Sequence, residues 1–327
     1  MSRNRSETSI TCQNPECIYY LTLEGRDIRK NGHNSAGNQT YFCMHCGKYF
    51  SETKNTPLYR SHLSYDEITF IFRLLCEKIS IKGIIRVLKH HEETIFRYIE
   101  RFAEHAARIN DFILTNIQIG DIELDEIWSF VFKKNKNITD TDDPTYGDFW
   151  IYTAIKRDSK LFVGFEGGKR DSDTCNRFVN LLFDRMELPT PDNPIRISTD
   201  GHHDYASEIS KVYCEPCVKY GQIIKEKSNG LVVDIIKRQV FSDIDLSDIT
   251  TSVVEGYNNK LRQRLSRLGR KVASFSKTVE GMVMALNIFQ FVSNFMDIKD
   301  DQTPIMREGL SEKPWTEEDF LNYHFQL

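Results

Sequence analysis

The sequence predicts an α/β core preceded by a small cysteine-rich segment and a helical segment. Three observations lead to this prediction. Residues 1–60 hold two cysteine pairs and lack helical periodicity, whereas residues 61–110 carry apolar side chains at helical spacing. From residue 117 onward, three strand-like runs are followed by a helix, a strand and further helices, which is an α/β pattern. A chain of 327 residues is long enough for two or three domains.

Composition narrows the class of protein. Hydrophobic residues make up 40% of the chain, but no run of about 18 apolar residues would span a membrane. The polar N-terminus has no signal-peptide pattern, so we expect a cytoplasmic protein whose eight cysteines are metal ligands or buried thiols rather than disulfides. The net charge of −4 argues weakly against nucleic-acid binding, but it sums over segments of opposite charge.

The first 60 residues contain a ligand pattern. Cys12-x4-Cys17 and Cys43-x2-Cys46 are two pairs of thiols, each on a short turn, and together they can close a tetrahedral thiolate site around Zn²⁺. A segment this small buries little core, so the metal would supply much of its stability. The alternative is four unrelated thiols. We predict a zinc-ribbon-like domain over residues 1–60.

Residues 61–115 are predicted to be helical. Ser64 and Glu67 form a capping-box pattern before an apolar periodic run, a short helix fits 80–88, and a longer one fits 92–109. A short helix, a brief turn and a longer helix indicate a helix-turn-helix that binds DNA. A plain three-helix bundle or a dimerisation element is the alternative. The residues expected to contact DNA are Lys89, His90, Thr94 and Arg97.

The remaining core is predicted from strand patterns. The first strand, within 117–133, carries Asp121, Glu123 and Asp125 on one face. A hairpin (149–157 and 161–168), a helix (171–186) and a strand ending at Asp200 follow. A short helix is expected over 205–211 and a weak strand over 218–224, whereas 225–250 carries no clear pattern. The apolar run 282–295 fits a core helix or a contact helix.

Residues 251–278 combine one acid, Glu255, with seven cations. As a helix, this stretch buries Val254, Tyr257, Leu261, Leu265 and Leu268 on one seam. An acid able to hold a metal beside cations able to hold phosphates suggests chemistry on a nucleic-acid backbone. A solvated basic helix face is the alternative.

Three acids from distant segments can meet in such a fold. Asp125 lies in the first strand, Asp200 ends the fourth, and Glu255 lies on a later helix. Each also has an ordinary explanation: a strand-surface acid, a turn aspartate and a first-turn helix acid. His202 and His203, beside Asp200, are expected to serve local hydrogen bonding rather than catalysis. Cys214-x2-Cys217 is either half a zinc site or a loop with two free thiols.

Four blocks resemble the DDE transposases of the insertion-sequence-one family: ELDEIWSF (123–130), ISTDGHHDYAS (197–207), the stretch 251–280 and the double cysteine pair. The resemblance implies an RNase H-like catalytic domain over 116–298, a mixed sheet with flanking helices. The excess of acids and an N-cap pattern at Thr316 predict an acidic tail with a short helix over 299–327. The resemblance assigns catalysis to Asp125, Asp200 and Glu255, holding two Mg²⁺ (or Mn²⁺) ions. The residues expected to contact DNA in this domain are Asn258, Arg262, Arg267, Arg270 and Lys271.

The expected function is that of a DNA transposase. It would bind the terminal inverted repeats of a transposon, cleave a strand, and transfer the 3′-OH into target DNA. The alternatives are a DNA-binding regulator and an RNase H-like nuclease without strand transfer. The expected partners are double-stranded DNA and further copies of the chain, as a homodimer or a larger homo-oligomer.

Overall fold

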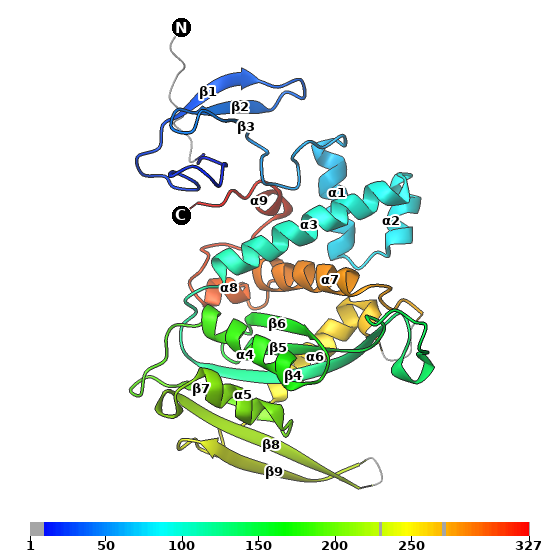
Figure 1. Ribbon diagram of the computed structural model, residues 1–327, viewed down its shortest axis with the longest axis vertical. Coiled ribbons are helices and arrows are strands. Elements are labelled where there is room, and N and C mark those ends of the chain that lie inside the picture. Colours follow the sequence, from blue (N-terminus) through cyan, green and yellow to red (C-terminus); the bar gives the residue numbers. More distant parts are fainter. Residues whose placement is uncertain (1–9, 229–230, 270–272, 327) are drawn as a thin grey trace. The chain divides into compact units, whose positions relative to one another are not determined.

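The computed structural model describes residues 10–228, 231–269 and 273–326 (Figure 1). The chain divides into two compact units. The first comprises residues 1–112 with 315–327, and the second comprises residues 113–314. Each unit has its own core and is described separately below.

The first unit begins with an antiparallel sheet of β1 (Ile28–His33), β2 (Gln39–Cys43) and β3 (Tyr49–Ser51). Three helices follow: α1 (Tyr65–Cys76), α2 (Ile81–Leu88) and α3 (Glu92–Ile113). The predicted capping box is confirmed, because Ser64 Oγ accepts from the Glu67 backbone N–H while the Glu67 carboxylate accepts from that of Ser64. The predicted C-terminal helix is α9 (Glu317–Leu321), whose Phe320 stacks on Phe72 of α1 with 4.3 Å between ring centroids.

The second unit is built on a six-stranded mixed sheet in the order β6-β5-β4-β7-β8-β9. Its strands are β4 (Asp121–Val131), β5 (Gly147–Lys156), β6 (Phe162–Gly168), β7 (Ile195–Asp200), β8 (Val218–Ser228) and β9 (Leu231–Phe241). The first three pair antiparallel, β7 is parallel to β4, β8 is parallel to β7, and β9 is antiparallel to β8. This mixed sheet with flanking helices confirms the expected RNase H-like class.

Helices cover both faces of this sheet. Tyr152 of β5 packs against Phe178 of α4 (Ser172–Arg185) and Tyr205 of α5 (Asp204–Val212). The next side chain along the strand, Ile151, points to the opposite face, where it joins a cluster with Val254 of α6 (Ser252–Arg264). The remaining short elements are η1 (Asn135–Asn137), η2 (Glu215–Cys217), η3 (Ser266–Leu268) and α8 (Pro304–Arg307).

The buried seam predicted for 251–278 is largely confirmed, but its helix is shorter than expected. Val254, Tyr257, Leu261 and Leu268 are buried in one cluster, with Leu265 packed against it. α6 ends at Arg264 because Leu265 adopts an extended conformation, and the 3-10 turn η3 then carries Leu268 into the core.

The apolar run after this helix forms α7 (Val279–Phe291) and the π-helical turn η4 (Val292–Met296). Residues 279–296 are long and apolar enough to pass for a membrane span, but Met282, Leu286 and Phe289 lie in the core of the second unit. Of the two roles that the sequence left open, the core helix is therefore the one that the structure shows.

The region 225–250, which showed no clear pattern, contains the end of β8 and all of β9. The side chains of β9 from Leu231 to Gln239 are exposed on both faces, so no apolar alternation marks the strand. The alternation that identifies a strand arises only when one face is buried.

Candidate active site

Three carboxylates meet where β4 and β7 stop pairing. The parallel register ends at Leu124 opposite Thr199, so the next residues, Asp125 and Asp200, lie side by side at the carboxyl end of β7. Carboxylate oxygens of Asp125, Glu126 and Asp200 all lie within 4.8 Å of one another. Oxygen ligands at this separation suit a hard divalent cation such as Mg²⁺ or Mn²⁺. The structure thus brings together two of the three acids predicted from the sequence.

Asp125 is held by the helix that covers its face of the sheet. Asn258 of α6 donates from Nδ2 to Asp125 Oδ2 at 2.8 Å, and its Oδ1 accepts from Thr153 Oγ1 at 3.1 Å. Burial and the nearby charge of Asp200 raise the pKa of Asp125 to about 6, against the effect of this hydrogen bond. Asn258 had been expected to contact DNA, but it is buried and both ends of its amide are engaged within the protein.

Glu255 lies near this cluster but outside it. Its charge reaches Asp125, where it opposes ionisation. Its own Oε1 accepts hydrogen bonds from Lys225 and from Thr251 Oγ1, the latter at 2.7 Å. Burial opposes the ionisation of Glu255, but these two hydrogen bonds outweigh it and lower its pKa. Glu255 is therefore paired with Lys225, and this pairing favours its charged form.

Glu126 is the member of the cluster that sequence reasoning missed. Its side chain is only 2% exposed, and Oε2 accepts from Arg170 at 3.2 Å. Oε1 has no hydrogen-bond partner among the described residues, although the hydroxyl of Tyr205 lies near enough to favour the charged form. Burial, followed by the charge of Asp200, raises the pKa of Glu126 to about 8.

Strand alternation explains why Glu126 was missed. Neighbouring side chains on β4 point to opposite faces, so Asp125 and Glu126 were not expected to share a site. β7 covers β4 only up to Leu124, so side chains from both faces can reach the space beyond the end of β7. The only signal in the sequence was the adjacency of the two acids in ELDEIW.

The other acids of the predicted strand face have structural partners. Glu123 Oε2 accepts from the backbone N–H groups of Val253 and Val254 at 2.8 and 3.0 Å, so it caps the first turn of α6. Arg157 bridges Glu123 and Asp121, at 3.1 and 3.0 Å. These contacts place α6, and with it Asn258 and Glu255, against the strand that carries Asp125.

The two histidines after Asp200 behave differently. His202 is buried, its backbone N–H donates to Asp200 Oδ1 at 3.0 Å, and its Nε2 lies 3.3 Å from the hydroxyl of Tyr152. His203 is exposed and lies 3.0 Å from Asp204. These contacts match the expected local hydrogen bonding.

The predicted cations of residues 251–278 fall into three groups. Arg262 lies on the same face of α6 as Glu255 and Asn258, at helical spacings of seven and four residues. Arg267 is turned into the protein, with Nη1 donating to Gly281 O and to Ser276 Oγ, so it does not fit the expected DNA contact. Arg270 and Lys271 lie outside the described residues.

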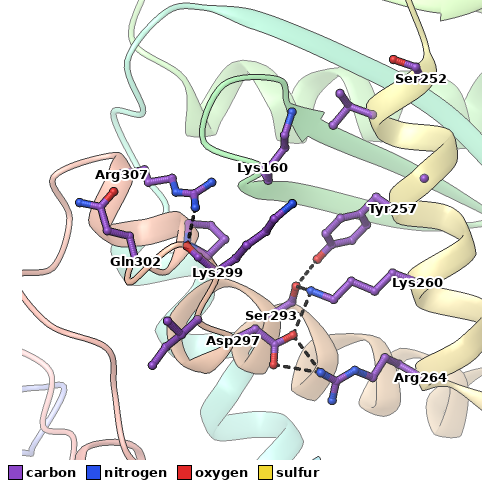
Figure 2. Close-up of a pocket in the computed structure, with 14 residues that line it drawn as sticks. Lys160, Ser252, Tyr257, Lys260, Arg264, Ser293, Asp297, Lys299, Gln302 and Arg307 are labelled. Atoms are coloured by element: carbon purple, nitrogen blue, oxygen red, sulfur yellow. Dashed lines mark hydrogen bonds and ion pairs between the residues drawn. The ribbon is translucent and has the colours of Figure 1, made fainter.

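The opposite side of α6 carries a cation-lined pocket of about 530 Å³ (Figure 2). Lys260 and Arg264 pair there with Asp297, at 2.9 and 3.2 Å. The other cations that line the pocket are Lys160, Lys299 and Arg307. Five cations and one acid make this hollow attractive to an anion.

In the first unit, the four predicted ligand thiols form one cluster. The sulfur atoms of Cys12, Cys17, Cys43 and Cys46 lie within 4.8 Å of one another, and the first three residues are buried. Burial raises the pKa of Cys12 and of Cys43, whereas backbone and side-chain hydrogen bonds lower that of Cys46 to about 7 against the effect of burial. The cluster can hold a metal ion, and a set of four thiolates suits Zn²⁺.

The predicted DNA-contacting residues of the helical segment lie around the turn between α2 and α3. Lys89 is the C-cap of α2, in a left-handed conformation with φ of 58°, and it is exposed. Arg97 is exposed on α3 and Thr94 is half-buried there. His90 Nε2 lies 3.1 Å from Oε1 of Glu67 in α1.

Neither alternative weighed for Cys214 and Cys217 holds. The structure joins the two sulfur atoms in a disulfide between α5 and β8, so they are neither half a metal site nor free thiols. The general expectation of no disulfides is wrong at this position. The short spacing along the chain brings the two Cα atoms to 5.4 Å, within the range that a disulfide spans.

Comparisons with known proteins agree with the sequence resemblance. The chain is 29% identical over 158 residues to the insertion element IS1 4 protein InsB of Escherichia coli strain K12. The match covers 48% of this chain and 66% of that relative, just under two thirds of its length. The IS1 protein InsB of Shigella sonnei is 28% identical over 48% of this chain and 84% of its own. The resemblance to the insertion-sequence-one family is confirmed.

Two further comparisons add little. No protein-family model matches the chain. Among solved structures, a piggyBac transposase synaptic complex with hairpin DNA aligns with 83% of this chain and 74% of its own, at 12% identity. Its TM-score of 0.37 is too low to bear on fold or function.

Proposed function

We propose that this homologue of the IS1 InsB proteins is a DNA transposase. The observation that carries the proposal is the convergence of Asp125 and Asp200, with Glu255 on the adjacent helix. Asp200 lies 75 positions after Asp125, and Glu255 lies 55 positions after Asp200, so only the fold brings these residues together. A site of carboxylates fits divalent cations. The proposed substrates are double-stranded transposon ends and target DNA.

In this proposal, Asp125, Asp200 and Glu255 hold two Mg²⁺ or Mn²⁺ ions. Bound there, the ions would align the attacking oxygen and neutralise charge on the leaving oxygen of a phosphodiester. Asn258 fixes the carboxylate of Asp125. Glu255 would leave its ion pair with Lys225 in order to bind a metal ion. Arg262, on the face shared with Glu255 and Asn258, contacts the DNA backbone. Arg270 and Lys271, which lie outside the described residues, are proposed as further DNA contacts.

The chain's own residues would then perform two successive reactions. Hydrolysis at the transposon end frees a 3′-OH, and this hydroxyl attacks a phosphodiester of the target. Both reactions displace one oxygen on phosphorus by another, so the same carboxylates serve both. The cation-lined pocket behind α6 offers a second place for a DNA phosphate, because its cations outnumber its single acid.

The first unit is proposed to bind the transposon ends. The four-cysteine cluster would hold Zn²⁺ over residues 1–60, and α2 and α3 would act as a helix-turn-helix over 61–115. The short turn between these helices, with Lys89 and Arg97 exposed beside it, supports this role. The catalytic domain would span 116–298 and the acidic tail 299–327.

A strand-transfer assay with terminal inverted repeats, Mg²⁺ and a target plasmid tests the proposal. We expect the wild type to join the ends to the target. Asp125→Asn, Asp200→Asn and Glu255→Gln should each lower joining by at least about a hundredfold and still bind the ends. Glu166→Gln on β6, which removes a carboxylate outside the cluster, is the matched control and should join normally.

The same assay separates the alternatives. Cleavage without joining would indicate an RNase H-like nuclease, and end binding without cleavage would indicate a DNA-binding regulator. Near wild-type joining by Asp125→Asn would refute the assignment of the catalytic site.

A further inference from the structure

We propose that the outer edge of β9 is a dimer interface that pairs antiparallel with β9 of a second copy of this chain. β9 ends the six-stranded sheet, and no other described strand pairs with its outer edge (Figure 1). Edge strands of monomers are usually short, covered or rich in charge. This one is 11 residues long and is regular from Asp234 to Gln239, and its exposed apolar side chains are Leu231, Val232, Val233, Ile235 and Ile236.

Symmetry restricts how two copies of one strand can pair. Antiparallel copies are related by a two-fold axis perpendicular to the sheet, and this axis leaves each side chain on its own face. Residues that lie opposite each other share a face. At the axis, one residue must therefore lie opposite the same residue of the second copy. Only registers centred on such a residue are allowed.

The register centred on Ile236 is complementary to itself. It pairs Ile236 with Ile236 of the second copy, and it pairs Asp234 with Arg238 twice, once on each side of the axis. The β8 register is regular from Asp234 to Gln239 and shifts at Val233 and Val240, so this match is confined to the regular part of the strand. The side chains on this face of the regular part read acid, apolar, base, so each meets its complement across the axis.

The neighbouring registers lack this match. Centring on Ile235 sets Asp234 against Ile236. Centring on Lys237 sets two lysines against each other and Arg238 against Ile236. Like charges directly opposite are destabilising, and neither of these registers pairs Asp234 with Arg238. Charge complementarity thus selects a second copy, in one register.

Contacts within the chain leave this face available. On the other face, Lys237 Nζ donates to Leu246 O at 2.9 Å, and Gln239 Nε2 donates to Ile244 O. By contrast, neither Asp234 nor Arg238 forms an ion pair among the described residues, and the Asp234 carboxylate accepts only from the backbone N–H of Ile235.

Charge reversal tests the register on the full-length protein. Sedimentation velocity over a concentration series would compare the wild type with Asp234→Arg, Arg238→Asp and the double variant. Each single change turns two attractive pairs into two repulsive ones, so the dimer dissociation constant should rise at least about tenfold. The double variant exchanges the partners and should restore the wild-type constant.

Lys237→Glu is the matched control, because it reverses a charge on the same strand that faces Ile235 across the interface. It should leave the dissociation constant unchanged. A wild type that stays monomeric at micromolar concentration would overturn the proposal. So would single variants that dimerise normally, or a double variant that stays dissociated. The outcome does not depend on strand transfer.

Discussion

Asn258 Nδ2 donates to Asp125 Oδ2 at 2.8 Å, across 133 residues of sequence. This hydrogen bond joins the helix that carries Glu255 to the strand that carries Asp125. Because it favours the charged form of Asp125, it opposes burial and the charge of Asp200, which raise the pKa of this carboxyl group. Asn258 is thus a positioning residue for the proposed metal site.

Asn258→Ala should shift the pH profile of strand cleavage. Without the hydrogen bond, the pKa of Asp125 rises further above about 6, so the protonated fraction near pH 7 increases. The acidic limb of the cleavage profile should therefore move to higher pH. Cleavage rates between pH 5.5 and 8.5 would measure this, with Asn259→Ala, an exposed neighbour on α6, as the control. An unmoved acidic limb would argue against the positioning role.

Lys225→Gln should strengthen binding of divalent metal. In the structure Glu255 is held by Lys225, and this pairing competes with metal coordination. An exposed ion pair is worth up to about 1 kcal/mol, so its loss should raise Mn²⁺ affinity by up to about fivefold. Electron paramagnetic resonance of free Mn²⁺ would measure the affinity. Lys219→Gln, on the same strand, should have a smaller effect, and equal effects would point to charge alone.

Glu126→Gln should stabilise the protein at alkaline pH when no divalent metal is added. Burial, followed by the charge of Asp200, raises the pKa of Glu126 from 4.5 to about 8. The folded state therefore favours the protonated acid, so the stabilisation is full below pH 4.5 and is lost as pH rises through 8. The glutamine amide of the variant does not ionise, so the variant does not lose stability in this way as the pH rises.

Urea unfolding at pH 5 and pH 8 would measure this difference. From pH 5 to pH 8, the free energy of unfolding of the variant should rise relative to that of the wild type by on the order of 2–4 kcal/mol. Glu166→Gln is the control and should follow the wild-type dependence. The same dependence in Glu126→Gln as in the wild type would show that Glu126 is not the buried acid responsible.

Cys43→Ser should remove a structural metal from the first unit. Four clustered thiols suit Zn²⁺, and so small a segment depends on the metal for its fold. The zinc content should fall from about one ion per chain to almost none, and residues 10–60 should become sensitive to protease. Cys76→Ser, outside the cluster, should retain its zinc. Equal zinc content in both variants would exclude the four-cysteine site.

The sequence by itself determined the order of elements outside residues 225–250, the four-cysteine pattern and, through the family resemblance, two members of the carboxylate cluster. The cysteine pairs needed only local spacing. Asp125 lies within one predicted strand and Asp200 ends another, and the family resemblance assigned both to one site. The buried seam of α6 also followed from helical spacing. These features depend on neighbours in the chain, so periodicity and turn chemistry predict them.

Only the tertiary structure decided which groups share the site. Glu126 joins Asp125 because β7 ends before it, and strand alternation alone assigns the two acids to opposite faces. Asn258 and Arg267 turned inward because Asp125 and Gly281 O supply partners from distant segments. Glu255 pairs with Lys225, which lies in the region without a sequence pattern. Hydrogen bonds and ion pairs between distant segments depend on strand register and strand length, and no local pattern in the sequence encodes these.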